Sequence, residues 1–252
     1  MKQFPLIMGI LNTTPDSFFD GGKYAAIEAA IRRAEDILSQ GGDIIDIGGQ
    51  STRPGSGDVE IKTEIQRTLP VILEIKRLWP NTEISIDTFN YETAKEALSA
   101  GATIINDVSG LKDTRLATLA ADYDAKLVIM HARSKPADMQ NFCDYDDILA
   151  DIHKFFEEKI EIAKQLGVKN IILDPGLGFA KTRKQNWQLL DNLDCFKNLN
   201  LPFLIGASRK SFTDKTLEKS LEAVKKAYQA NAAILRVHDV KETKQFLENL
   251  RD

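Results

Sequence analysis

Eight short apolar runs, each followed by a polar or Gly-containing loop and then by an amphipathic stretch, constrain the fold of this chain most. The runs cover residues 6–11, 44–47, 84–86, 103–105, 127–130, 171–173, 203–205 and 233–237. Continuous Ile, Val and Leu character is typical of strands in a parallel sheet that is covered on both faces. Eight strands that alternate with helices predict a single (β/α)8 barrel, with a doubly wound open sheet as the less favoured alternative.

The amphipathic stretches between these runs are predicted helices. Apolar residues recur at three- and four-residue intervals most plainly in residues 24–39, 61–78, 91–100, 148–166 and 221–229. Gly or Pro follows several of these stretches and precedes the next apolar run, as expected where a helix ends. No linker rich in Pro, Gly or Ser divides the chain, so we expect one domain over residues 1–252.

Composition and charge exclude several classes of protein. A length of 252 residues suits a single (β/α)8 domain. A formal net charge of -4 argues against a nucleic-acid binder that works by bulk electrostatics. Cys143 and Cys195 form no CxxC motif, which fits a reducing cytoplasm. The first apolar run is interrupted by Pro5 and is too short for a signal peptide or a membrane span. We therefore expect a cytoplasmic protein that binds neither nucleic acid nor membranes.

Polar side chains that could take part in chemistry follow all eight predicted strands. They are Asn12, Asp46, Asp87, Thr88, Asn106, Asp107, His131, Asp174, residues 208–211, Arg236 and His238. In a barrel the carboxyl ends of the strands meet on one face, where such barrels place their active sites. Each residue alone could instead cap the helix that follows its strand. Their recurrence after every strand predicts a site on this face.

The segment LIGASRKS, residues 204–211, combines a buried strand with a basic turn. The apolar run stops at Gly206, and a hydroxyl, two cations and a second hydroxyl follow within a few positions. Backbone N–H groups at the start of a following helix would favour negative charge here. The segment therefore predicts an anion-binding turn, and a solvated basic turn is the alternative.

Two loops, residues 12–22 and 48–57, are rich in Gly, Pro, Ser and Thr, as lids and binding loops on barrels often are. Neither is a Walker A motif or a GxGxxG turn. Arg53 offers a fork of donors suited to phosphate, although a loop Arg can also be a solvated charge. No His/Cys cluster has the spacing of a zinc site.

Two interpretations are also open for Asp174, and two for the pair formed by Arg236 and His238. Asp174 follows three apolar residues, so we expect its carboxylate at the barrel mouth, partly out of water, where it could accept from two adjacent N–H donors of a planar heterocycle. It could instead cap a helix or pair with Lys181. Arg236 and His238 alternate along the last strand and should point to the same side, as an anion clamp would require. His238 could also be an ordinary hydrogen-bonding residue.

Seven motifs occur in series along the chain: MGILNTTPDSFFDGG, DIIDIGGQSTRPG, SIDT, IINDVSG, LDPGLGF, GASRKS and RVHDV. In order and spacing they resemble the motif set of the dihydropteroate synthases, the folate-pathway enzymes that sulfonamides inhibit. The resemblance spans nearly the whole chain. It implies a (β/α)8 barrel that condenses 6-hydroxymethyl-7,8-dihydropterin pyrophosphate with p-aminobenzoate, with Mg²⁺ required. The products would be pyrophosphate and 7,8-dihydropteroate, and sulfonamides would compete with p-aminobenzoate.

The resemblance also implies roles for individual residues. Those of the pterin pocket would be Asp87, Asn106, Asp174, Gly206 and Lys210. Those that hold the pyrophosphate would be Asn12, Arg53, Arg236 and His238, with the Asn12 oxygen as a ligand of Mg²⁺. Those beside p-aminobenzoate would be Thr52, Pro54, Phe179 and Ser211, where a helix start at Ser211 would suit the carboxylate.

The implied reaction is largely dissociative, because the cation left by pyrophosphate is delocalised into the pterin ring. Stabilisation of charge would then dominate catalysis. The residues expected to supply it are Asp20, Arg53, Lys210, Arg236 and His238, with Asp20 closing over the cation.

The sequence departs from the family pattern in four places. Gln50 stands where Glu is usual, and Ala180 stands where Gly is usual. The stretch after Ser211 is shorter than usual, with Lys219 and Ser220 in place of a Gly-Thr or Gly-Ser pair. The first strand begins within a few residues of Met1, whereas family members carry an extra segment over the barrel floor. The chain could therefore be part of a fusion with a preceding pterin pyrophosphokinase, or another chain could cover its floor.

Two alternatives to an active synthase remain at this point. One is a pterin-binding methyltransferase that acts on methyltetrahydrofolate, against which SRKS and RVHDV argue. The other is a non-catalytic paralogue that binds pterin or a partner without turnover, which Gln50 and the shortened stretch would favour. The family is commonly dimeric, so the resemblance also implies a homodimer.

Overall fold

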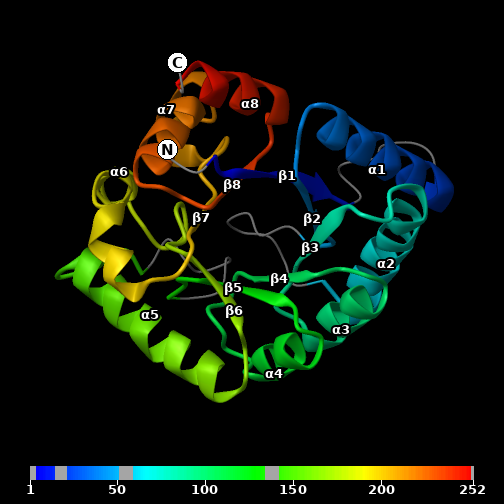
Figure 1. The fold of residues 1–252 in the computed structure, drawn as a ribbon, viewed down its shortest axis with the longest axis horizontal. Coiled ribbons are helices and arrows are strands. Elements are labelled where there is room, and N and C mark those ends of the chain that lie inside the picture. Colours follow the sequence, from blue (N-terminus) through cyan, green and yellow to red (C-terminus); the bar gives the residue numbers. More distant parts are fainter. Residues whose placement is uncertain (1–3, 15–21, 51–58, 134–141, 251–252) are drawn as a thin grey trace.

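The computed structural model describes residues 4–14, 22–50, 59–133 and 142–250. Its eight strands are all parallel and form one sheet in the order β6-β5-β4-β3-β2-β1-β8-β7. Leu173 and Phe203 form a parallel bridge between the two edges, where the Leu173 N–H donates to the Pro202 carbonyl over 2.9 Å. The sheet therefore closes almost completely, and the predicted (β/α)8 barrel is confirmed (Figure 1).

The strands lie close to the predicted apolar runs. They are β1 (Leu6–Asn12), β2 (Ile44–Gly48), β3 (Glu83–Asp87), β4 (Ile104–Asp107), β5 (Lys126–Met130), β6 (Asn170–Asp174), β7 (Leu204–Ile205) and β8 (Ile234–Val237). The helices form a ring outside the sheet (Figure 1). They are α1 (Gly22–Ser39), α2 (Ile61–Leu78), α3 (Tyr91–Ser99), α4 (Arg115–Asp122), α5 (Ile148–Gln165), α6 (Arg183–Asp191), α7 (Leu217–Gln229) and α8 (Val240–Asn249), with 3₁₀ turns η3 (Leu193–Leu199) and η4 (Ser211–Thr213). In the described part of the chain, none of them has both the length and the apolar character that crossing a membrane requires.

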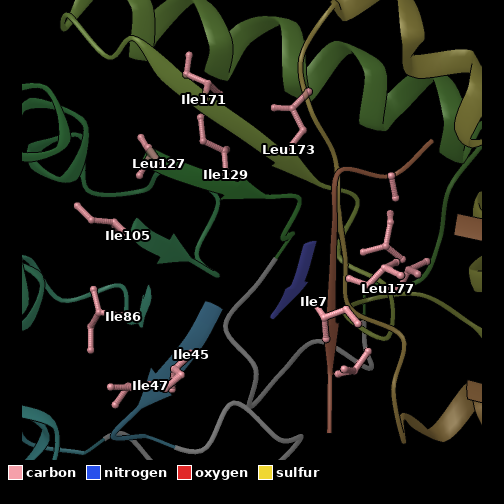
Figure 2. Packing of buried hydrophobic residues seen from close by; sticks show 14 of the residues in the cluster. Ile7, Ile45, Ile47, Ile86, Ile105, Leu127, Ile129, Ile171, Leu173 and Leu177 are labelled. Carbon is pink, nitrogen blue, oxygen red and sulfur yellow. The ribbon is translucent and has the colours of Figure 1, made fainter. Parts of the chain in front are cut away.

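Alternate residues of each strand face two different surroundings. One set packs with the helices in the main apolar cluster, as Ile45, Ile86 and Leu127 do in Figure 2. The other set points into the barrel and forms a separate cluster, made of Met8, Ile44, Ile104, Val128, Ile172, Leu204 and Ile234. Full burial of one such side chain stabilises a fold by roughly 2 kcal/mol. Burial on both faces explains why the strands appear in the sequence as continuous apolar runs.

The floor of the barrel is closed by the chain's own side chains. At the amino ends of β3 and β5, Lys126 Nζ lies 2.5 Å from Glu83 Oε1. Ile44, Ile104 and Ile234 above them are at most 3% exposed. The exposed apolar residues described at this end are Leu6, Leu78, Tyr123 and Leu166, which are 37% to 44% exposed. The inward apolar layer at this end is buried, and the hypothesis that another chain covers the floor stays a prediction.

The inward positions become polar toward the carboxyl ends of the strands. Because side chains on one face of a strand recur every second residue, the polar layer stands two residues beyond the apolar one. The pairs of successive inward residues are Ile44 and Asp46, Ser85 and Asp87, Ile104 and Asn106, Ile172 and Asp174, and Ile234 and Arg236. This layer forms the base of the candidate site.

Candidate active site

Arg236 lies at the centre of the polar layer and joins three strands. Its Nε is 2.6 Å from Asp46 Oδ2 on β2, and its Nη2 is 2.6 Å from Asp87 Oδ2 on β3. The Asp46 carboxylate also accepts from the Asn106 amide nitrogen on β4, over 3.3 Å to each oxygen. The structure therefore brings together Asp87, Asn106 and Arg236, as the sequence predicts.

The electrostatics of Asp87 follow from its burial beside a second carboxylate. Burial raises the pKa of Asp87, and the charges of Asp46 and Glu64 add to the rise, while Arg236 opposes it. Burial disfavours the Arg236 charge as well, but Asp46 and Asp87 hold its pKa above the usual value. The pKa of Asp87 rises despite this pairing because the effect of burial exceeds that of the Arg236 charge. Asp87 Oδ1 is buried and accepts from no group among the described residues, which leaves it ready for a ligand N–H.

Asp174, at the end of β6, is more buried than predicted. It is 6% exposed, because the loop after β6 turns back over it and the Gly176 N–H donates to Asp174 Oδ1 over 2.7 Å. A φ of +68° at Gly176, which glycine adopts without strain, makes this turn possible. Burial raises the pKa of Asp174, and the Lys210 charge is the strongest opposing influence. Asp174 caps no helix and makes no ion pair with Lys181, whose Nζ contacts the ring of His131 and two carbonyls instead.

Lys210 reaches into the same space from the segment after β7. Its Nζ donates to the Leu177 carbonyl and lies 4.7 Å from the centre of the Phe179 ring. A Cβ on Gly206 would lie 3.8 Å from Lys210 Nζ and 3.8 Å from Arg236 Cδ, so this glycine lies beside both cationic side chains. Burial lowers the pKa of Lys210 to about 8, with Asp174 and Asp87 opposing the shift and Arg236 adding to it.

The rest of the SRKS turn differs from the prediction. Ser211 is exposed and begins the short 3₁₀ helix η4, so the helix that starts at Ser211 is not the longer α7. The helix α7 begins only at Leu217, because the Thr216 side chain caps it by accepting from the Lys219 N–H. Arg209 turns away from the site, with Nε 2.7 Å and Nη2 2.9 Å from the Asp239 carboxylate.

His238 is held next to Arg236 by hydrogen bonds with Ser208 and Arg33. Its N–H donates to Ser208 Oγ over 3.1 Å, its Nδ1 lies 3.2 Å from the same oxygen, and its carbonyl accepts from Arg33 Nη2 over 2.7 Å. Burial and the Arg236 charge lower its pKa to about 4. His238 is therefore neutral near pH 7 and can supply a hydrogen bond to an anion, but no charge.

Asn12, at the end of β1, lies beside Asp87 where Gly48 leaves space. A Cβ on Gly48 would lie 3.8 Å from Asn12 Oδ1 and 3.7 Å from Asp87 Oδ2. Amide and carboxylate oxygens are the ligands that Mg²⁺ prefers, often one or two from the protein with phosphate and water oxygens completing the shell. Within the described residues, no group of three His, Cys, Asp or Glu side chains could hold a metal. These residues fit a Mg²⁺ that takes few ligands from the protein.

The remaining predicted residues fall into two groups. Asp20, Thr52, Arg53 and Pro54 fall outside the described residues. Two strand-end residues form local turns instead of lining the site: Asp107 accepts from the N–H groups of Ser109 and Leu111 over 2.8 and 2.6 Å, and Thr88 Oγ1 accepts from the Asn90 N–H over 3.1 Å.

Two residues of the site received no role from the sequence. In the sequence Asp46 is only one of many polar residues that follow predicted strands. It stands two residues after Ile44, however, as the other inward polar residues stand two residues after the preceding inward residue. Glu64, on α2, is 1% exposed and accepts from Asn90 Nδ2 over 2.8 Å and from Thr93 Oγ1 over 2.6 Å. It steadies the segment after Asp87, and no local pattern in the sequence indicates this contact.

The arrangement can recognise a planar heterocycle that carries an anionic group. Asp87 and Asp174 offer buried acceptors, and Lys210 offers a donor. Arg236, although its Nε and Nη2 are paired with Asp46 and Asp87, keeps further guanidinium N–H groups for an anion. A ligand with several N–H groups and a phosphate would match this set.

Comparison with known proteins identifies the family. Residues 8–238 match the family described as pterin binding enzyme. The dihydropteroate synthase of Synechocystis sp. is 44% identical over 246 residues, which cover 93% of this chain and 85% of that protein.

Solved structures agree with this match over nearly the whole chain. The dihydropteroate synthase of Clostridium difficile, solved in the presence of pteroic acid, superposes with a TM-score of 0.91 and 41% identity, covering 98% of this chain and 96% of that one. The Yersinia pestis enzyme in complex with a sulfonamide drug gives a TM-score of 0.91 and 36% identity, covering 98% of this chain and 93% of that one. The chain therefore belongs to the dihydropteroate synthase family of pterin-binding enzymes.

Proposed function

We propose that this protein is a dihydropteroate synthase of folate biosynthesis, which transfers the dihydropterin-methyl group from its pyrophosphate ester to p-aminobenzoate. The observation that carries this proposal is the set of buried acceptors, Asp87 and Asp174, that faces Lys210 and Arg236 at the carboxyl end of the barrel. Relatives named as synthases make the methyltransferase alternative the weaker one.

The pterin ring fits the buried part of the site. Its 2-amino and N3–H groups would donate to the Asp174 carboxylate, and its acceptor edge would receive a hydrogen bond from Lys210. Asp87 Oδ1, which is buried without a partner among the described residues, would accept from a further ring N–H together with Asn106. Gly206 leaves room for the ring because a side chain there would contact both cations.

The pyrophosphate would lie above Arg236 and His238. Arg236 is paired with Asp46 and Asp87, so phosphate oxygens would share its guanidinium with these carboxylates. His238, neutral near pH 7, would donate a hydrogen bond. We assign Asn12 as a ligand of Mg²⁺ and Arg53 as a further phosphate donor. When bound, the metal would neutralise charge on the leaving pyrophosphate.

The chemical step needs stabilised charge more than acid–base catalysis. Pyrophosphate departs from the carbon attached to the electron-rich ring, and the amine of p-aminobenzoate then attacks that carbon. Asp87 and Asp174, held in a buried site, favour the positive charge that spreads into the ring. Asp20 would close over the cation, and the aryl ring would lie between Thr52, Pro54, Phe179 and Ser211.

Release of pyrophosphate tests this function directly. We expect release only when the pterin pyrophosphate, p-aminobenzoate and Mg²⁺ are all present, and we expect a sulfonamide to compete with p-aminobenzoate. Pterin binding without any release at high enzyme concentration would instead indicate the non-catalytic paralogue. Transfer of a methyl group from methyltetrahydrofolate would indicate the methyltransferase.

Three further expectations accompany this function. A homodimer, a fusion to a preceding pterin pyrophosphokinase domain and a cytoplasmic location remain predictions. Light scattering of the purified chain would measure the first of them.

A further inference from the structure

Lys181, just before α6, is buried behind the site and has three hydrogen-bond acceptors around its head group. It is 8% exposed. Its Nζ lies 3.0 Å from His131 Nδ1, 3.0 Å from the Gly176 carbonyl and 2.9 Å from the Phe179 carbonyl. Burial lowers the pKa of Lys181 to about 7, with the Asp174 charge opposing the shift. In its ammonium form Lys181 has three N–H donors and no acceptor, so each donor has one partner.

The third acceptor is Nδ1 of His131, which can accept only when the imidazole is neutral. His131, at the end of β5, is 3% exposed, and burial together with the Lys181 and Arg133 charges lowers its pKa to about 2. Because the Lys181 ammonium has no acceptor, the neutral ring accepts through Nδ1 and carries its proton on Nε2. Lys181 thus links the end of β5 to the loop that follows β6.

The backbone of this loop, residues 174–181, is irregular. Gly176, Gly178 and Ala180 have φ values of +68°, +83° and +48°. The Gly178 N–H donates to Asn186 Oδ1 over 2.6 Å. Lys181 holds the loop on both sides of this contact, through the carbonyls of Gly176 and Phe179.

The same loop shapes the surroundings of Lys210. The Leu177 carbonyl accepts from Lys210 Nζ, and the Phe179 ring lies 4.7 Å from it. A Cβ on Gly178 would lie 2.9 Å from Lys210 Cδ, so the loop backbone touches the Lys210 stem. A shift of the loop would therefore move the Lys210 head group.

We infer that Lys181 is a positioning residue for the reaction: it fixes the loop at residues 174–181 and, through Leu177 and Phe179, the head group of Lys210. This inference rests on the proposed function, in which Lys210 binds the pterin ring. Lys181 itself does not touch the substrate.

The test is pterin affinity, measured by calorimetry with 6-hydroxymethylpterin. We expect Lys181→Met to bind the pterin at least about tenfold more weakly than the wild type, a loss of about 1.4 kcal/mol. Lys159→Met is the matched control, because Lys159 on α5 also donates to a carbonyl, that of Leu111 over 3.1 Å, away from the loop. The control should bind within about twofold of the wild type.

A double-mutant cycle separates positioning from general damage. If Lys181 acts through Lys210, Lys181→Met should change pterin affinity much less in a Lys210→Ala background than in the wild type. The Lys181→Met enzyme should also show a raised KM for the pterin pyrophosphate. Should Lys181→Met fail to fold, Lys181→Gln, which keeps two donors for the three acceptors, replaces it under the same criteria.

The outcomes are distinct. Additive effects in the cycle, or an unchanged affinity in a folded Lys181 variant of a pterin-binding protein, would overturn this inference alone. No pterin binding by the wild type would overturn the proposed function and this inference with it.

Discussion

Arg236 and Asp46 form an ion pair inside the barrel, with Arg236 Nε 2.6 Å from Asp46 Oδ2 and the Asp46 side chain fully buried. Breaking a buried pair by removing one partner is costly because the other charge stays out of water. We expect Asp46→Asn to lower the free energy of unfolding by about 3 kcal/mol. Urea denaturation at pH 7 measures this loss.

Asp124→Asn serves as the control for this prediction. Asp124 pairs with Lys169 over 3.0 Å, but both side chains are more than half exposed, at 67% and 74%. An exposed pair contributes at most about 1 kcal/mol, so the control should unfold almost like the wild type. Equal losses in the two variants would mean that the Arg236 pair is not buried as described.

The contact between Arg236 and Asp46 also marks what the sequence could and could not predict. The polar inward positions were predictable, because Asp46, Asn106 and Asp174 each stand two residues after a buried inward Ile. The pairing itself was not predictable, because it joins residues 190 positions apart and exists only once the barrel closes. The contact of Lys181 with His131, 50 positions away, and those of Glu64 with Asn90 and Thr93, 26 and 29 positions away, were not predictable either.

Short elements limited the prediction of the fold. The sequence did not mark α4, α6 and α8, which have 8, 9 and 10 residues, although α3, also with nine, was predicted from its apolar period. The basic turn after β7 was read as the start of a helix, whereas the chain first makes the 3₁₀ turn η4 and reaches α7 only after the Thr216 cap. Local capping chemistry, more than the apolar pattern, decided where α7 begins.

Lys210→Ala should weaken pterin binding without unfolding the protein. A hydrogen bond from a charged donor contributes roughly 2 kcal/mol, or about 30-fold in affinity. The fold should persist, because burial lowers the pKa of Lys210 and the fold therefore gains little from its charge. Calorimetry with a pterin and a thermal melt measure the two effects.

Lys219→Ala is the matched control for Lys210→Ala. Lys219 lies in the same region of the chain, but its Nζ pairs with Asp214 over 2.9 Å and takes no part in the proposed pterin pocket. The control should keep the pterin affinity of the wild type. An unchanged affinity in Lys210→Ala would refute the role of Lys210.

His238→Gln should lower kcat/KM by a factor that is the same from pH 5.5 to pH 8. Burial and the Arg236 charge lower the pKa of His238 to about 4, so the free enzyme holds it neutral across this range. The pH dependence of kcat/KM reports the pKa values of the free enzyme. Removal of a neutral group therefore lowers kcat/KM by the same factor at every pH and leaves the shape of the pH profile unchanged. A variant-to-wild-type ratio that changes near pH 6.5 would show that His238 titrates normally.

The stability of the same variant gives an independent check on His238. The unfolded chain binds a proton at His238 near pH 6.5, whereas the folded chain binds it only near pH 4, so this group lowers stability as pH falls between these values. In His238→Gln the free energy of unfolding should fall less steeply as pH falls over that interval. The difference in slope should correspond to up to about one bound proton. Urea denaturation at pH 4.5, 5.5 and 6.5 would measure the slope for each protein.

Gly178→Ala and Gly167→Ala should destabilise the fold alike but differ in pterin binding. Both glycines have left-handed backbones, with φ of +83° and +88°, which cost an L-residue roughly 1 to 2 kcal/mol. A Cβ at Gly178 would lie 2.9 Å from Lys210 Cδ, whereas one at Gly167 would lie 3.5 Å from Ala121 Cβ, an ordinary contact. We therefore expect Gly178→Ala to push Lys210 out of place and weaken pterin binding about tenfold, and Gly167→Ala to leave it unchanged. Calorimetry on both variants, corrected for any unfolded fraction seen in their thermal melts, measures this difference in pterin affinity. Equal affinities would show that the loop backbone does not set the position of Lys210.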